Sequence, residues 1–301
     1  MNLTPDSKVI IQGLRDSDPS LKVALNMKAY STNIVACVSA GRGGEIIHQI
    51  PVYDLVEQAQ AAVGPVDTSV ILVHPYDVLD AALEAIDAGI RQLVIVTEGM
   101  PPLDMVRLVR KAEATETLVV GPNCPGIIVP GKLLLGTHPP QFYTPGSIGL
   151  ISRSSTLTYE VAQALTDAKL GQSLSVCIGS DLIVGSSFIQ WLQILDEDDH
   201  TDAIVLVGEI GGSSEEEAAS YIAETIDKPV VAYITGLHAP KAQLISHAST
   251  IITSKFTQDL HPGTAQSKIS VFEKAKIPVA SSPSQIPELL KKCLKKTRSH
   301  K

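Results

Sequence analysis

The sequence predicts an α/β fold with two sheets of mainly parallel strands, one in each half of the chain. Short, uniformly apolar runs alternate with segments of helical length, beginning with residues 8–12 and 21–30. Strands that are covered on both faces by helices have this uniformly apolar character. The chain has 301 residues, of which 44% are hydrophobic, so it can form two domains, each with its own core.

In the first half we predict five buried strands, and Pro51, Val52 and Tyr53 lead into one of the helices between them. The strands are residues 8–12, 34–38, 69–73, 93–96 and 118–120, and the helices are residues 21–30, a segment ending near 63, 78–88 and 102–112. Ligands of such sheets bind beyond the carboxyl ends of the strands. We therefore expect the loops at Gly13, 40–44, 74–76, 97–100 and 121–126 to converge on one edge.

Residues 126–146 are rich in proline, and we place the connection between the two domains here. A second alternating series follows. Its strands are residues 147–151, 174–178, 203–207, 229–234 and 278–280, and its helices include residues 157–168, 188–195 and a final helix from Ser284. Ser213 and Glu216 have the spacing of a capping box at the start of one further helix.

Composition narrows the classes of function. The net charge of -8 argues against a general nucleic-acid partner. The four cysteines have no paired CxxC spacing and are typical of reduced cytoplasmic thiols. No apolar run reaches membrane-spanning length, and the early first strand leads us to expect no transit peptide. The sequence thus predicts a cytoplasmic protein that binds neither nucleic acid nor membrane.

A hydroxyl-rich turn stands between the strand at 147–151 and the helix that follows it. Ser154, Ser155 and Thr156 occupy the predicted start of that helix. Free backbone N–H groups and the helix dipole make such a start suitable for a phosphate or carboxylate. Serine and threonine also favour this position as ordinary helix caps, so both interpretations remain open.

Glu209 and His247 are candidates for phosphoryl chemistry. Glu209 follows a predicted strand and is flanked by glycines, and its carboxylate could orient a histidine. His247 lies between Ser246 and Ala248, which leave its imidazole open to approach, and a histidine with a fixed tautomer can be a nucleophile. The alternative is a surface histidine in a loop. Since no histidine pair has the HExxH spacing, we expect no protein-held metal.

Six motifs resemble, in order and spacing, the α subunit of succinyl-CoA synthetase (succinate–CoA ligase). They are residues 39–44 (SAGRGG), 95–99 (IVTEG), 121–126 (GPNCPG), 152–160 (SRSSTLTYE), 208–212 (GEIGG) and 246–249 (SHAS). The resemblance covers nearly the whole chain. It implies a Rossmann-like CoA-binding domain at residues 1–130, a connection at 131–146, and a flavodoxin-like ligase domain at 147–301.

The resemblance also implies a reaction and its residues. Succinate, CoA and ATP or GTP would give succinyl-CoA, with His247 carrying the phosphoryl group and Glu209 pairing with it. Ser154, Ser155 and Thr156 would bind phosphate, and Tyr159 would lie near the substrate. The residues implied near CoA are Gly13, Arg15, Ser17, Ser20, Ser39, Arg42, Thr97, Glu98, Asn123 and Cys124. The nucleotide and Mg²⁺ would be held by a partner β subunit with an ATP-grasp fold.

The turn at residues 13–20 departs from the family pattern. Asp16 and Pro19 replace glycines, and Asp18 adds a second carboxylate. Each carboxylate near a phosphate costs about 1 kcal/mol at partial exposure, and Arg15 offsets part of this. The alternative function is therefore a non-catalytic, CoA-ligase-like regulatory subunit that binds a nucleotide or acyl-CoA. A third interpretation, an NAD-dependent dehydrogenase, rests on the sheet alone and lacks a GxGxxG turn.

Overall fold

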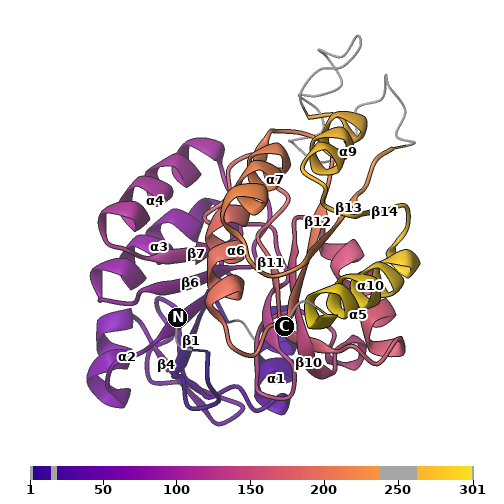
Figure 1. The fold of residues 1–301 in the computed structure, drawn as a ribbon. Coiled ribbons are helices and arrows are strands. Elements are labelled where there is room, and N and C mark those ends of the chain that lie inside the picture. Colours follow the sequence, from indigo (N-terminus) through magenta and orange to yellow (C-terminus); the bar gives the residue numbers. More distant parts are fainter. Residues whose placement is uncertain (1–2, 15–18, 238–262, 300–301) are drawn as a thin grey trace. The chain divides into compact units, whose positions relative to one another are not determined.

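The chain folds into two compact α/β units (Figure 1). The computed structural model describes residues 3–14, 19–237 and 263–299. The first unit comprises Met1–His138 together with Ile183–Gly185, and the second comprises Pro139–Leu182 and Ser186–Lys301. The α/β class predicted from the alternating apolar runs is confirmed.

The sheet of the first unit has the strand order of a Rossmann fold. Parallel strands run in the order β4-β2-β1-β5-β6-β7, and β3 pairs antiparallel with β4 at the edge. Counted along the chain without β3, this is the order 3-2-1-4-5-6. The strands are β1 Val9–Gln12, β2 Ile34–Val38, β3 Ile46–Ile47, β4 Ile50–Tyr53, β5 Thr68–Ile71, β6 Gln92–Ile95 and β7 Leu118–Val120.

The helices of the first unit cover its sheet because their apolar residues pack on buried strand residues. The helices are α1 Pro19–Ala29, α2 Val56–Val63, α3 Val78–Asp87 and α4 Pro102–Ala114, with a short 3-10 helix η1 at Pro75–Asp77. Ile10 of β1 and Leu93 of β6 share one core cluster with Ala82 of α3 and Leu108 of α4. Uniform burial of β1, β5 and β6 explains why their sequences do not alternate.

Part of the proline-rich segment forms a hairpin in the first unit. β8 (Gly126–Val129) and β9 (Leu133–Gly136) pair antiparallel, and α1 packs against β9. The Thr32 hydroxyl, which follows α1, donates to the Leu134 carbonyl oxygen at 2.7 Å. The segment at residues 131–146 thus includes β9, the 3-10 helix η2 (Pro140–Phe142) and the first residues of β10.

The second unit has the strand order of a flavodoxin-like fold. Its parallel strands run in the order β14-β13-β12-β10-β11, which is 2-1-3-4-5 read from the other edge. The strands are β10 Pro145–Ser152, β11 Gln172–Cys177, β12 Ala203–Gly208, β13 Val230–Ile234 and β14 Val279–Ala280. Residues of β12 are buried throughout, so this strand lies at the centre of the core.

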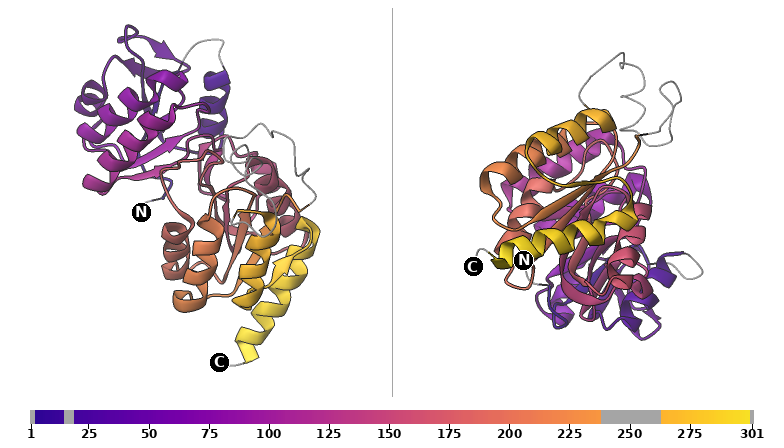
Figure 2. Two further views of the ribbon diagram at one scale, coloured as in Figure 1. Left: turned by 90° about the horizontal axis from the view of Figure 1, so that it is seen from above. Right: turned by 45° about the vertical axis from the view of Figure 1, so that its right-hand side comes forward.

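Two groups of helices flank this sheet in Figure 1. α5 and α10 pack together on one face, and α6, α7 and α9 pack on the other. α10, in yellow in Figure 2, packs on β12 and β13 of its face. The bounds are α5 Ser155–Asp167, α6 Phe188–Glu197, α7 Ser214–Thr225, α9 Ala265–Lys274, the 3-10 helix η3 Pro283–Gln285 and α10 Ile286–Ser299.

The predicted capping box at α7 is wrong. Ser213 occupies the N-cap position, but its hydroxyl donates to Glu217 at 2.7 Å instead of accepting from the first turn. The Glu216 carboxylate accepts from the Gly263 N–H at 3.2 Å and lies 3.3 Å from the Lys268 ammonium. A buried ammonium needs an anionic partner more than the helix needs a second cap bond. A capping box does form at α6, between Ser187 and Gln190.

A buried histidine makes the first unit sensitive to acid. His138 is 1% exposed, and its Nε2 lies 3.0 Å from the Gly126 carbonyl oxygen. Burial lowers the pKa of His138 from 6.5 to about 4, although this hydrogen bond opposes the shift. Above pH 6.5 the imidazole is neutral in both the folded and the unfolded state. Between pH 6.5 and 4 only the unfolded chain binds the proton, so folding loses stability as the pH falls.

We therefore expect the free energy of unfolding to fall by up to about 3 kcal/mol more between pH 7 and 4 in the parent chain than in His138→Gln. Chemical denaturation at several pH values measures this difference. His200→Gln, which removes an exposed histidine, serves as the control. Equal pH slopes for the parent and His138→Gln would show that His138 gains its proton without unfolding.

Candidate functional site

In the first unit, the loops after β1 and β5 meet where the strand order reverses. The Gly13 N–H donates to the Val38 carbonyl oxygen at 3.0 Å, and a Cβ at Gly13 would come within 2.8 Å of the Val73 backbone. Gly13 also has a φ of +94°, which side chains disfavour. Both the close Val73 backbone and this φ therefore require glycine here. Ligands of Rossmann sheets bind at this reversal point.

Arg42 connects the loop after β2 to the loop after β1. Its guanidinium donates to the Leu14 carbonyl oxygen at 3.2 Å and forms a salt bridge with Glu45. The half-buried Ser39 lies at the base of the same loop, where its N–H donates to the Tyr53 carbonyl oxygen at 2.9 Å. A cationic side chain thus lies at this edge of the sheet.

The loops after β6 and β7 join the same edge through hydrogen bonds in series. The Thr97 hydroxyl donates to the Val73 carbonyl oxygen at 2.8 Å, and the Asn123 N–H donates to the Thr97 carbonyl oxygen at 2.9 Å. The Cys124 thiol is buried and donates to a β6 carbonyl oxygen. Glu98 beside Thr97 is exposed.

The predicted set also includes Ser20 and three residues outside the described ranges. Ser20 is buried in the first turn of α1, whose first residue is Pro19. Arg15, Ser17 and His247 lie outside the described residues.

The second unit has its own reversal point, between β10 and β12. The loop after β10 carries Arg153 and Ser154, and the loop after β12 begins with Glu209. Ser154 is the N-cap residue of α5, in an extended conformation with φ of -100° and ψ of 120°, yet its hydroxyl makes no hydrogen bond to the first turn. Its carbonyl oxygen accepts from the Thr158 hydroxyl at 2.5 Å. The side-chain cap expected at an ordinary helix start is therefore missing here.

Cys177 is the last residue of β11 and lies near residues of the loops that follow β10 and β12. Burial raises the pKa of its thiol to about 12, and the nearby Glu209 carboxylate raises it as well. The Gly179 backbone N–H and the Ser155 hydroxyl form hydrogen bonds with the sulfur and oppose this shift. The Glu209 carboxylate thus lies close enough to act on the charge of this thiol, and the first turn of α5 lies beside the same sulfur atom. Since Cys177 holds its proton at neutral pH, it is no candidate nucleophile.

The remaining predicted residues of this site lie along the first turns of α5. Thr156 is exposed, and Tyr159 is half-buried, with its ring centroid 6.4 Å from that of Phe142. Tyr159 also lies close enough to Tyr143 to add to the rise in the pKa of that phenol, which burial mainly causes.

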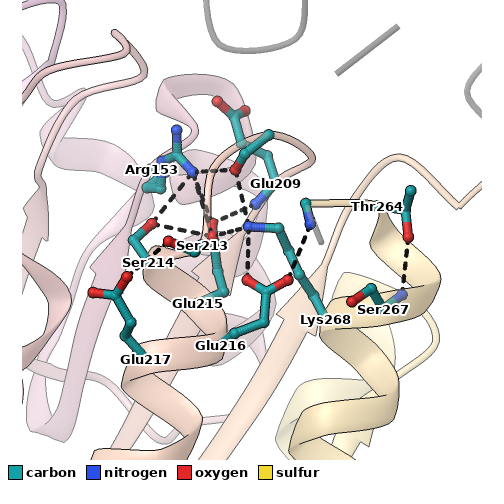
Figure 3. Close-up of polar contacts among 12 residues, drawn as sticks. Arg153, Glu209, Ser213, Ser214, Glu215, Glu216, Glu217, Thr264, Ser267 and Lys268 are labelled. Carbon is teal, nitrogen blue, oxygen red and sulfur yellow. Dashed lines mark hydrogen bonds and ion pairs between the residues drawn. The ribbon is translucent and has the colours of Figure 1, made fainter. Parts of the chain in front are cut away.

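Sequence reasoning missed a buried charged cluster beside Glu209, drawn in Figure 3. The Glu215 carboxylate, fully buried at the start of α7, forms salt bridges with Arg153 at 3.1 Å and with Lys268 of α9. The Lys268 ammonium is also fully buried and donates to the Gly211 carbonyl oxygen at 2.9 Å. Lys268 follows Glu215 by 53 residues, so no local pattern signals this pair.

Two kinds of feature are absent from the described residues. Among them, no three or more His, Cys, Asp or Glu side chains gather closely enough to bind a metal ion. The helices of the described ranges also include none that is long and apolar enough to cross a membrane.

The chain matches two family models, one in each unit. Residues 4–99 match the model described as "CoA binding domain", and residues 151–260 match the model described as "CoA-ligase". The two strand orders, and the loops that meet where each order reverses, agree with these matches. The chain is therefore a CoA ligase chain with a CoA-binding domain and a ligase domain.

Curated relatives narrow the class further. The chain is 42% identical to succinate–CoA ligase [ADP-forming] subunit alpha 2 of Archaeoglobus fulgidus, covering 96% of this chain and 97% of that protein. It is 41% identical to the alpha subunit of Aquifex aeolicus, covering 96% and 93%. The chain belongs to the family of succinate–CoA ligase alpha subunits.

Solved structures share the fold at lower identity. An ATP citrate lyase from Methanothrix soehngenii, in complex with citrate and coenzyme A, superposes with a TM-score of 0.85 at 21% identity. That comparison covers 100% of this chain and 51% of the lyase, so the chain spans about half of the lyase's length. An acetyl-coenzyme A synthetase from Ca. Korarchaeum cryptofilum gives a TM-score of 0.71 at 21% identity, covering 92% and 58%.

The missing cap at α5 gives a direct test of the two interpretations of Ser154. Because its hydroxyl makes no cap bond, we expect Ser154→Ala to change the free energy of unfolding by less than about 0.5 kcal/mol. The matched control is Ser187→Ala, which removes the side-chain cap of α6 and should cost about 1 kcal/mol. Chemical denaturation measures both. Equal losses would mean that Ser154 is an ordinary cap.

Proposed function

We propose that this chain is the alpha subunit of a nucleotide-dependent succinate–CoA ligase that works through a phosphohistidine at His247. The observation that carries this proposal is that Glu209 and Ser154 follow the neighbouring parallel strands β12 and β10, and that Arg153, beside Ser154, donates to the Gly211 carbonyl oxygen of the Glu209 loop at 3.1 Å. A carboxylate that can orient an imidazole and a helix start that can hold an anion are the two parts this chemistry needs. The family membership favours this function over a non-catalytic regulator.

The proposed reaction has three steps. A His247 nitrogen attacks the γ-phosphorus of the nucleotide and the nucleoside diphosphate leaves. A succinate carboxylate oxygen then takes the phosphoryl group, which frees the histidine and gives succinyl phosphate. The CoA thiolate attacks the acyl carbon, and inorganic phosphate leaves as succinyl-CoA forms. In this scheme Glu209 holds the histidine in one tautomer, and Tyr159 contacts the substrate.

The phosphoryl group would be held at the start of α5. Three features support this site: the first N–H groups of a helix are free of intrahelical partners, the dipole is positive at this end, and the Ser154 hydroxyl is not used as a cap. Ser155 and Thr156 add hydroxyls beside it.

CoA would bind along the strand-end edge of the first unit. Gly13 allows a close backbone approach, Arg42 supplies positive charge, and the loops with Ser39, Thr97, Glu98, Asn123 and Cys124 lie along the same edge. Pro19 fits the first turn of α1 without strain, although it removes one N–H that could contact a phosphate. Arg15, Ser17 and Ser20 belong to the same proposed turn.

The proposal includes a partner and a compartment. An ATP-grasp β subunit would supply the nucleotide and Mg²⁺, and the ADP-forming relatives favour ATP as the nucleotide. The four cysteines are free thiols, which supports a cytoplasmic location.

Phosphorylation of the chain tests the proposal. With the ATP-grasp partner, Mg²⁺ and γ-labelled ATP, we expect acid-labile label on the chain that is lost in His247→Asn and kept in His200→Asn, which removes an exposed histidine. Glu209→Gln should slow labelling about a hundredfold, because the histidine loses the carboxylate that orients it. Quenched-flow labelling measures both rates. Label of equal amount in His247→Asn would exclude the phosphohistidine.

Calorimetric titration with CoA tests the other half of the site. We expect the chain with its partner to bind CoA, and Asp16→Asn to bind it up to about fivefold more tightly at low salt, since one carboxylate near a phosphate costs about 1 kcal/mol. Asp87→Asn, which removes an exposed carboxylate at the far end of α3, is the matched control and should leave the affinity unchanged. No detectable CoA binding by the parent would exclude this part of the proposal.

A further inference from the structure

Four charged side chains form a buried hub under the loop at residues 209–212 (Figure 3). The hub consists of Arg153, Glu215, Glu216 and Lys268, of which Glu215 and Lys268 are fully buried and Glu216 is 16% exposed at its side chain. Two carboxylates face two basic groups, so the formal charges cancel. A buried charge without a partner would be strongly unfavourable, and here each one has a partner of opposite sign.

The hub holds the backbone of the loop that carries Glu209. The Glu209 N–H donates to Glu215 Oε1 at 3.1 Å, and the Gly211 carbonyl oxygen accepts from both Arg153, at 3.1 Å, and Lys268, at 2.9 Å. The loop is held from a third side as well, because the Gly211 N–H donates to the Gly263 carbonyl oxygen at 2.8 Å.

The packing leaves little freedom at this contact. A Cβ at Gly208 would come within 2.5 Å of the Glu215 side chain, so glycine at this position allows the carboxylate to approach the loop. Charge-assisted hydrogen bonds in a buried setting are shorter and stronger than neutral ones. The N–H of Glu209 and both backbone groups of Gly211 are thereby held, which limits the directions in which the Glu209 side chain can leave the loop.

The same hub reaches the start of α5. Arg153 directly precedes Ser154, and its N–H donates to the Val207 carbonyl oxygen of β12 at 3.0 Å. One side chain therefore connects the proposed phosphate turn with the loop of Glu209.

We propose that Glu215 and Lys268 are positioning residues for phosphoryl transfer, which hold Glu209 in register with the start of α5. The proposal rests on the function proposed above. Neither side chain is assigned contact with a substrate; both act through the loop at residues 209–212.

The test uses the double variant Glu215→Gln/Lys268→Met in the full chain with its partner. Removing one charge of each sign keeps the net charge of the hub unchanged. Arg153 retains its bond to the Gly211 carbonyl oxygen at 3.1 Å and Glu216 retains the one from the Gly263 N–H at 3.2 Å, so circular dichroism should show a retained fold. We expect phosphohistidine formation to slow about tenfold to a hundredfold, because small misplacements of reacting groups cost this much. The affinity for CoA should stay unchanged. The matched control Lys228→Met removes an ammonium that donates to the Leu195 and Asp198 carbonyl oxygens, away from this loop, and should leave the rate unchanged.

A second measurement separates this proposal from the proposed function. Amide hydrogen exchange at Glu209 and Gly211 should be at least about tenfold faster in the double variant than in the parent or in Lys228→Met. The amides of strand β12 should keep the protection that they have in the parent. If the parent is not phosphorylated, the proposed function fails, and the exchange at Glu209 still decides whether the hub positions the loop. Exchange equal to the parent's, labelling at the parent's rate, or an equal loss of CoA affinity would each overturn the positioning role.

Discussion

Parallel strand order is the constraint on which both halves of this chain depend. In each unit two neighbouring strands are followed by helices that pack on opposite faces of the sheet, as α5 and α7 do after β10 and β12. The loops that follow these two strands therefore run in opposite directions. A crevice is left between them at the carboxyl ends of the strands, and ligands of such sheets bind there. The candidate phosphate turn and the loop of Glu209 both lie at such a point, as does Gly13 in the first unit.

The buried hub beside Glu209 is not explained by stability alone. Taking four charged groups out of water costs free energy that their mutual attraction repays only when the geometry is good, and apolar replacements of buried ion pairs are often as stable. What distinguishes this hub is where its hydrogen bonds go. Arg153, Glu215 and Lys268 all bind backbone groups of one loop. An apolar cluster of the same volume could fill the space but could not fix those groups.

Much of the fold could be predicted from sequence, because buried parallel strands are uniformly apolar and helices follow them at regular intervals. The strand-end positions of Glu209 and Ser154 followed from the same pattern. Contacts between distant residues could not be predicted, as with Glu215 and Lys268, and they also explain the wrong capping box, because Lys268 takes the Glu216 carboxylate. The box at Ser187 has the Ser-x-x-Gln signature and was detectable.

The cancelled charges of the hub have a consequence for the response of the two halves to ionic strength. An anion at the start of α5 would be attracted by backbone dipoles within one turn, and the neutral hub beside it adds little long-range field. Such short-range attraction in a partly buried turn is weakly screened by dissolved ions. The Arg42 guanidinium, which is 23% exposed and paired with the more exposed Glu45, lies where dissolved ions can screen it more. Added salt would therefore weaken a ligand bound beside Arg42 before it weakened an anion bound at the start of α5.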